Sequence, residues 1–281
     1  MKRGENLIHL PIMVDEVLKN LLWNKKGVYI DATVGLGGHT LAILKNSESN
    51  VIGIDLDKKQ IKLASERLRA FGKRVLLVIG NYGYMDRFLN IKVDGILFDF
   101  GISSYQLDDP ERGFSYRKEG PLDMRYGKGG TTAKDIIENW SEKKIAEILY
   151  LYGEEKFSKV IAQKIKKEIP QSTSELALIV RKSVPRERAH KHLSKVFQAL
   201  RIAVNEEFLN IEKGINSAAN LLKEKGKLVV ITYHSKEEKL VCSKTRENNL
   251  KFITKKPILP SKAEFLKNPR CRSAHLRVFE K

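Results

Sequence analysis

Cysteine is scarce in this chain of 281 residues, and the residue types that build disulfides or metal sites are scattered. The two cysteines, Cys242 and Cys271, form no CxxC pair and no disulfide framework. Six dispersed histidines without clustered cysteines argue against a catalytic metal. Apolar runs of membrane-spanning length are missing, and residues 1–6 lack the apolar segment of a signal peptide. The sequence therefore predicts a cytoplasmic protein without a metal site or a membrane span.

Acidic residues are also in deficit. The chain has 52 Lys and Arg against 34 Asp and Glu, so its formal net charge is +18, and its pI is about 9.7. Such an excess favours a polyanionic partner, and nucleic acid is the first candidate. The alternative is that much of the lysine simply covers solvated helix surfaces.

A glycine cluster follows the first apolar run. Residues 28–44 read as a strand, a tight turn and a helix start, the opening unit of a nucleotide-binding α/β sheet. A dinucleotide fingerprint would need a third glycine after Gly35 and Gly37, but Thr40 stands there. A second strand ends in Asp55, whose carboxylate could accept hydrogen bonds from a ribose diol. The pattern fits adenosine cofactors, including S-adenosyl-L-methionine (SAM); a βαβ turn without a ligand is the alternative.

The alternation of strands and helices stops in the middle of the chain. Strands are predicted at 75–79 and 94–99, and a long loop rich in glycine follows at 102–130. Residues 133–182 read as helical throughout, and a later helical region runs from Phe197 and is stopped by Gly226. Strands resume at 227–233 and at 276–279. The predicted fold is therefore an α/β sheet with an inserted all-helical domain. We place the sheet domain at 1–105 and 200–281 and the insert at 106–199.

Several segments together carry a family resemblance that runs from His9-Leu10-Pro11 to Arg277. They are Asp94–Asp109, Glu111–Tyr116, Pro121–Arg125, Phe197–Asn205 and Asn268–Ser273. This ordered set resembles the bacterial small-subunit ribosomal RNA cytosine-N4 methyltransferase family, the RsmH or MraW proteins. The resemblance implies a Rossmann-like SAM-dependent methyltransferase sheet with an inserted helical domain. It also implies methylation of the exocyclic N4 of a decoding-centre cytosine in 16S ribosomal RNA, within the assembled small subunit.

The resemblance also implies a set of cofactor-binding residues in this chain. The glycine loop would face the methionine part of SAM, Asp55 the ribose, and Tyr82 the adenine or sugar. Asp99 ends a strand at the edge where open α/β sheets bind ligands. The implied cofactor set is Gly37, Gly38, His39, Asp55, Tyr82, Asp99 and Gln106.

The acceptor of the N4 proton stays open between Asp99, Asp108 and Asp109. The amino-methyltransferase signature, Asn or Asp before two prolines and an aromatic residue, is absent; the sequence after Asp99 is Phe-Gly-Ile. Attack on cytosine C5 would need an accessible cysteine nucleophile. Cys242 lies in a helical stretch and Cys271 between two arginines, so neither favours C5 chemistry.

Basic residues near aromatic rings are the candidate RNA contacts, since unstacked bases pair well with such surfaces. They are Arg112 and Phe114 (with Tyr116), Arg186 and Arg188 in a basic run, and Arg270 and Arg272 in the tail. Each basic residue could equally be a solvated surface group.

The chain departs from the family pattern at three places. Residues 192–195, His-Leu-Ser-Lys, replace a Pro-Ala-Thr run, and Tyr82 stands where phenylalanine is common. Tyr233 opens a segment that in the family begins with phenylalanine. Two other functions remain open: a non-catalytic RNA-binding ribosome assembly factor, and a nicotinamide-dependent oxidoreductase, which the missing third glycine opposes. A homodimer is compatible with the sequence.

Overall fold

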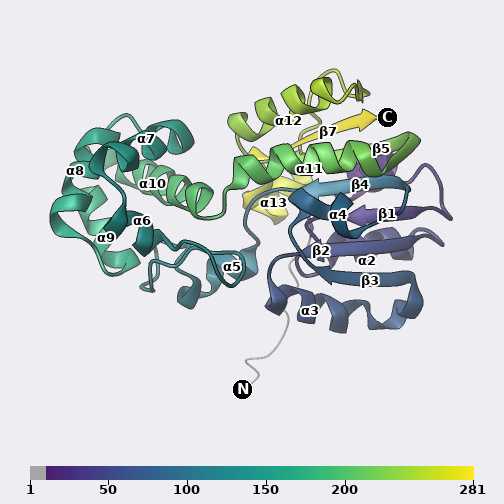
Figure 1. The fold of residues 1–281 in the computed structure, drawn as a ribbon, viewed down its shortest axis with the longest axis horizontal. Helices are drawn as coiled ribbons and strands as arrows, with labels where there is room; N and C mark the ends of the chain where they lie inside the picture. The colour runs from purple at the N-terminus through teal and green to yellow at the C-terminus, as the bar shows by residue number, and fades with distance from the viewer. Residues whose placement is uncertain (1–10) are drawn as a thin grey trace. The chain divides into compact units, whose positions relative to one another are not determined.

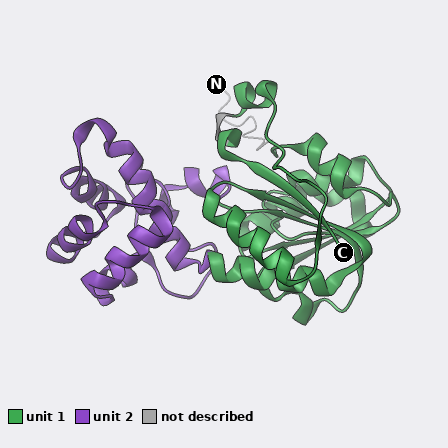
Figure 2. Cartoon of the chain, turned by 90° about the horizontal axis from the view of Figure 1, so that it is seen from above, with its two compact units in different colours: residues 1–101, 208–281 green, residues 102–207 purple. Residues whose placement is uncertain are grey.

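The computed structural model describes residues 11–281, except for the side chains of residues 269 and 270. The chain forms two compact units (Figure 2): unit 1 contains residues 1–101 and 208–281, and unit 2 contains residues 102–207. Strands occur in unit 1, whereas the elements of unit 2 are helices and loops. The predicted α/β fold with an inserted helical block is confirmed.

The boundaries of the inserted block differ from those we predicted. The units divide after Gly101 and after Glu207, rather than after residues 105 and 199. The second predicted boundary would cut helix α10 (Ala189–Val204), which is one continuous helix. Leu200 and its neighbours on this helix are buried in the core of unit 2, so the helix belongs to that unit as a whole.

Unit 1 is built around one seven-stranded sheet with the order β3-β2-β1-β4-β5-β7-β6 (Figure 1). The first five of these strands are parallel, and β7 runs antiparallel to both of its neighbours. The strands are β1 (Val28–Asp31), β2 (Asn50–Asp55), β3 (Val75–Ile79), β4 (Val93–Asp99), β5 (Leu222–Thr232), β6 (Lys251–Phe252) and β7 (His275–Glu280). The chain order reverses between β1 and β4, which is the switch point where open α/β sheets bind ligands.

Successive side chains along the strands pack alternately into two cores, one on each face of the sheet. Ile30, Ile96 and Val230 pack with α4 (Met85–Phe88), α11 (Glu207–Leu221) and α12 (Ser235–Glu247). Their neighbours along the strands, such as Tyr29 and Leu97, pack on the other face. That face is covered by α1 (Val14–Leu21), α2 (Gly38–Lys45) and α3 (Lys58–Leu68). Burial on both faces explains why these strands read as continuous apolar runs.

The start of β5 differs from the sequence expectation. We predicted that a helical region would end at Gly226, but α11 ends at Leu221 and β5 begins at Leu222. The register against β4 shifts between the pairs Val93–Leu222 and Gly95–Lys227. The intervening residues therefore form an irregular stretch that includes Lys225, whose φ is +66°. A bulge of this kind has little periodicity for sequence reading to detect.

Unit 2 has its own apolar core. Its longer helices are α6 (Ala133–Asn139), α7 (Glu142–Gly153), α8 (Ser158–Glu168), α9 (Thr173–Arg181) and α10. Buried residues from all five helices form one cluster. Helix α9 is capped at its start, since the Ser172 hydroxyl accepts the backbone N–H of Glu175.

The glycine-rich segment before α6 is held by close backbone contacts. It contains α5 (Ser104–Asp108) and a 3₁₀ turn, η3 (Pro110–Arg112). A Cβ atom on Gly113 would lie 1.8 Å from the Pro121 carbonyl oxygen, and one on Gly120 would lie 2.0 Å from that of Pro110. Gly113 also has a φ of +68°. Glycine is required at these two positions because the backbone passes too close for any side chain.

Among the described residues, no helix combines the length and apolar character that a membrane span would need.

Candidate functional site

The loop between β1 and α2 adopts the backbone conformations that its glycines permit. Gly35 and Gly37 have φ values of +52° and +77°, and Gly37 is the N-cap of α2. A Cβ on Gly37 would lie 3.0 Å from Leu68 Cδ1, so the loop also packs closely on α3. The first N–H groups of α2 have no partner within their helix, which makes this end a suitable place for an electronegative ligand group.

Asp55 ties the end of β2 to this loop. Its Oδ2 accepts the backbone N–H of Gly35 at 3.0 Å, and its Oδ1 accepts that of Asp57 at 2.8 Å. Burial raises the pKa of Asp55 to about 7, although both N–H groups counteract the rise. The carboxylate is therefore placed beside the glycine turn and can gain or lose a proton near neutral pH.

Asp99 ends β4 and lies at the centre of a polar cluster. Its backbone N–H donates to Thr33 Oγ1 at 2.7 Å, which fixes the strand end against the loop. The Tyr233 hydroxyl donates to Asp99 Oδ1 at 2.8 Å. His39 Nδ1 lies 3.9 Å from Asp99 Oδ2, while its Nε2 is 2.9 Å from the Ile12 carbonyl oxygen. Burial raises the pKa of Asp99, and His39 and Tyr233 counteract the rise.

Asp31 ends β1 and is electrostatically coupled to both other carboxylates. Its negative charge contributes to the raised pKa of Asp55 and of Asp99, in both cases after the larger effect of burial. The Thr40 hydroxyl donates to Asp31 Oδ2 at 2.7 Å. The ends of β1, β2 and β4 thus bring three carboxylates together around the glycine loop.

Two buried oxygens near this loop have no hydrogen-bond partner in the part of the chain that the structure describes: Asp31 Oδ1 and Gln60 Oε1. The Gln60 oxygen lies 3.5 Å from the position that a Cβ on Gly35 would take. Buried polar atoms in proteins normally have a partner, and an orphaned one needs a specific explanation. Both atoms are acceptors, so a ligand with N–H or O–H donors would satisfy them.

Tyr82 follows β3 and packs partly into the core of unit 1. Its ring centroid lies 5.4 Å from that of Phe98 and 5.7 Å from that of Phe100. A Cβ on Gly214 of α11 would approach Tyr82 Cδ2 to 2.8 Å, so the two elements are in close contact. The ring is partly exposed, so one part of it can contact a ligand. Its role in covering the adenine or sugar of a cofactor stays a prediction.

Gln106 belongs to unit 2, whereas the other predicted cofactor residues lie in unit 1. It is buried and closes a capping box at the start of α5, where its Oε1 accepts the Ser103 N–H at 3.2 Å. The two rival acceptors also lie in unit 2, with Asp108 at the end of α5 and Asp109 capping η3. Asp99 is thus the candidate acceptor that shares a unit with the glycine loop.

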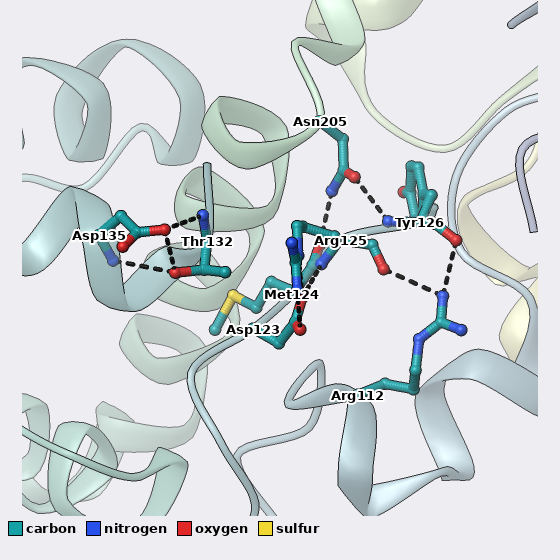
Figure 3. A network of polar contacts seen from close by, with 8 residues as sticks. All are labelled: Arg112, Asp123, Met124, Arg125, Tyr126, Thr132, Asp135 and Asn205. Carbon is teal, nitrogen blue, oxygen red and sulfur yellow. Dashed lines mark hydrogen bonds and ion pairs between the residues drawn. The ribbon is translucent and has the colours of Figure 1, made fainter. Parts of the chain in front are cut away.

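Arg112 participates in a polar network within unit 2 (Figure 3). Its Nη2 donates to the carbonyl oxygens of Arg125 and Tyr126, at 3.0 and 2.8 Å. Asn205 accepts the Tyr126 N–H at 2.8 Å and donates to the Met124 carbonyl at 2.7 Å. These contacts hold Met124 at its positive φ of +61°. The Arg112 guanidinium therefore stabilises the loop that contains Arg125 and Tyr126. We predicted only an RNA contact for this residue, not this structural role.

The predicted stacking role of Phe114 is wrong. The ring is 6% exposed and belongs to the core of unit 2. Its centroid lies 5.6 Å from that of the Tyr126 ring, with the two planes 29° apart. An unstacked RNA base needs an exposed aromatic face, which Phe114 does not offer. A basic residue two positions earlier suggested an exposed surface, but the tight turn at Gly113 directs the ring inward.

The remaining predicted RNA contacts are more accessible. Arg186 and Arg188 are exposed in a 3₁₀ turn, η4 (Arg186–Arg188), in unit 2. Arg272 is exposed in η5 (Pro269–Ser273) of unit 1. The side chain of Arg270 lies outside the described part of the structure. No group of three His, Cys, Asp or Glu side chains that could hold a metal ion occurs among the described residues.

Sequence reasoning missed Tyr233 and Asp31 as members of this cluster. Asp31 had a readable signal, because it ends the first predicted strand just as Asp55 and Asp99 end theirs. Tyr233 was noted only as a departure from the family's phenylalanine. Its contact joins residues 134 positions apart, and nothing in the local pattern indicates it.

Comparisons with known proteins place the chain in a family. A model of the MraW methylase family matches residues 6–281. The Ribosomal RNA small subunit methyltransferase H of Thermosipho africanus is 42% identical, and the match covers 100% of both chains. The proteins of the same name from Petrotoga mobilis and Carboxydothermus hydrogenoformans are 43% and 40% identical. These matches cover 95% and 97% of this chain and 99% and 97% of the relatives. The chain therefore belongs to the MraW methylase family.

Proposed function

We propose that this protein transfers a methyl group from SAM to the exocyclic N4 of a decoding-centre cytosine in 16S ribosomal RNA. The family assignment and the name of the relatives, a methyltransferase of the small ribosomal subunit, support the reaction class and the partner. The observation that carries the proposal is the meeting of three strand-end carboxylates around the glycine loop of unit 1. We expect the reaction to take place in the cytoplasm, on the assembled small subunit.

The residues of unit 1 suit the donor groups of SAM. The Asp55 carboxylate would accept the ribose hydroxyls, which is the usual task of an acid at the end of the second strand. Gly37, Gly38 and the start of α2 would border the methionine part, and Tyr82 the adenine or sugar. The orphaned oxygens of Asp31 and Gln60 would accept N–H or O–H donors of the cofactor. SAM supplies an already activated methyl group, so the protein's main task is alignment.

We assign to Asp99 the acceptance of a hydrogen bond, and then of the proton, from the cytosine amino group. The N4 lone pair is delocalised into the ring, and an acceptor on its hydrogens helps to localise it. Asp99 Oδ1 is held by Tyr233, so the carboxylate has a fixed orientation. Its raised pKa makes it a better base than an ordinary aspartate.

Exposed arginines support RNA binding in both units. Arg186 and Arg188 of unit 2 and Arg272 of unit 1 are exposed and can therefore contact phosphates. A target base inside folded RNA must leave its stack, which costs a few kcal/mol. The favourable free energy of such phosphate contacts can offset part of that cost.

The deciding experiment incubates the protein with radiolabelled SAM and small ribosomal subunits and then maps the methyl group. Label on N4 of one cytosine supports the proposal, whereas label on C5, or none, contradicts it. Asp99→Asn should lower the rate of methyl transfer by at least about 10²-fold, the usual contribution of a positioned acid or base. Calorimetry with SAM and with NAD provides the control, because NAD binding without SAM binding would indicate an oxidoreductase.

A further inference from the structure

The charge excess is unevenly divided between the two units. Unit 1 contains 32 Lys and Arg against 18 Asp and Glu, whereas unit 2 contains 20 against 16. The helical insert therefore accounts for only a small part of the +18 net charge. An interface confined to the insert would leave most of this charge without a partner.

Part of the excess follows one edge of the sheet. Residues 248–263 contain four lysines and no acidic residue: Lys251, Lys255, Lys256 and Lys262, all of them exposed. The segment begins with β6, the last strand in the sheet order. It then continues along β7, where Ile253 N–H donates to the Val278 carbonyl at 3.0 Å and Ile258 N–H to that of Leu276 at 2.9 Å. The sheet thus holds this segment at both ends, and Lys255 and Lys256 lie in a bend between the two points of attachment.

Helix α12, which lies near β7 in Figure 1, adds two exposed basic residues to this edge. They are Lys239 and Arg246, two helical turns apart on one face. The Arg246 guanidinium lies 5.0 Å from the centroid of the Phe252 ring on β6, so helix and strand are in contact. Arg277 of β7 donates to the carbonyl oxygens of Thr254 (3.4 Å) and Lys255 (3.1 Å), which anchors the segment after β6.

Nearby acidic side chains are already engaged by other groups. Glu238 binds Arg277 and His275 at 2.6 and 2.8 Å, and Glu247 binds Lys244 at 2.8 Å. Glu280 forms an ion pair with Lys227, and Glu264 accepts the Met13 N–H. These pairs engage acids of α12, of β7 and of the helix between β6 and β7 (α13, Lys262–Lys267). Glu280 also lies opposite Lys251 in the sheet, whereas no ion pair engages Lys255, Lys256 or Lys262 in the described part of the chain.

We propose that this edge binds the phosphate backbone of the ribosomal RNA at a distance from the target nucleotide. We call it the basic edge and define it as Lys239, Arg246, Lys251, Lys255, Lys256 and Lys262. RNA suits it because exposed lysines spaced along one edge of the sheet offer separate point charges to the phosphates of a nucleic-acid backbone. The partner follows from the proposed function, whereas the location on unit 1 follows from the charge distribution alone. The edge provides affinity and orientation, so it acts on KM rather than on the methyl-transfer step.

The test compares two triple variants of the full-length protein that remove the same charge. Lys251→Gln, Lys255→Gln and Lys256→Gln alter the basic edge. Lys62→Gln, Arg69→Gln and Lys73→Gln alter exposed residues of α3 and the 3₁₀ segment before β3, at the opposite end of the strand order. Binding to small subunits is measured over a range of salt concentrations, together with KM and kcat.

The edge variant should bind more weakly and have a higher KM at unchanged kcat. Its slope of log affinity against log salt should become shallower by about 2, because each lysine that pairs with a single-strand phosphate contributes about 0.7 to the slope. The control should keep the slope of the unmodified protein. Equal reductions in both variants, or an unchanged slope in the edge variant, would overturn the proposal. So would stronger binding of the unmodified protein to phosphatidylserine vesicles than to RNA.

Calorimetry with SAM should give the same affinity for both variants, which shows that unit 1 is intact. If the unmodified protein binds RNA through the edge but transfers no methyl group, the proposed function fails and the docking surface stands. If it methylates normally and the edge variant is unaffected, only the docking surface fails.

Discussion

Removing the Tyr233 hydroxyl tests how the chain tunes Asp99. Tyr233→Phe keeps the ring and deletes only the O–H that donates to Asp99 Oδ1 at 2.8 Å. This hydrogen bond stabilises the ionised carboxylate, so its loss should raise the pKa of Asp99 further above the ordinary value. A hydrogen bond to a charged group contributes about 1.5–3 kcal/mol, and one pKa unit corresponds to about 1.4 kcal/mol. The expected rise is therefore about 1–2 units.

The assay is the pH dependence of single-turnover methyl transfer with saturating SAM and ribosomal subunits. If Asp99 must be ionised, the rate falls on the acidic side with the pKa of Asp99. In Tyr233→Phe this acidic limb should move to higher pH by about 1–2 units, while the plateau rate at high pH is largely kept. Tyr150→Phe, which changes an exposed ring of unit 2, should leave the profile unaltered.

The same variant should alter the pH dependence of stability. A carboxyl group whose pKa is raised by folding binds its proton more tightly in the native state. Its contribution is therefore largest below the unfolded-state pKa and is lost as pH rises through the folded-state pKa. In Tyr233→Phe this loss should extend to higher pH, as measured by urea unfolding. An unchanged acidic limb, or a lower plateau without any shift, would refute the role of the tyrosine in tuning Asp99.

Three further predictions concern other residues. The ribose hydroxyls would donate to an ionised Asp55, whose pKa burial raises to about 7, so SAM affinity should increase from pH 6 to pH 8. Calorimetry in buffers of different ionisation enthalpy should detect proton release on binding, and an affinity that does not change with pH would contradict this. His192→Ala should lower the free energy of unfolding, measured in urea, by about 1.5–3 kcal/mol, because the fully buried Glu155 carboxylate loses a partner at 2.8 Å. The control is His190→Ala, which changes an exposed residue, and an equal decrease in both variants would contradict the prediction. Arg112→Gln should destabilise the protein by about 1–3 kcal/mol, because the Arg112 Nη2 donates to two backbone carbonyls. The salt dependence of RNA binding should stay unchanged, and a shallower slope would instead support a direct contact between Arg112 and RNA.

The sequence by itself determined the layout of the chain. Strands buried on both faces and amphipathic helices leave patterns that depend on a few neighbouring residues, so the sheet and the helical insert were readable. The glycine turn and the carboxylates that end strands, such as Asp55 and Asp99, were readable for the same reason. The family resemblance added the reaction, because long ordered motifs carry information that periodicity does not.

Only the tertiary structure decided which side chains meet. Tyr233 reaches Asp99 because β4 and β5 are neighbours with Asp99 opposite Ile231, a pairing that joins distant parts of the chain. Phe114 points into a core and Arg112 onto carbonyl groups because a tight turn at Gly113 redirects the backbone. Such contacts depend on strand order and chain crossings, which arise from packing over the whole unit rather than from local preference.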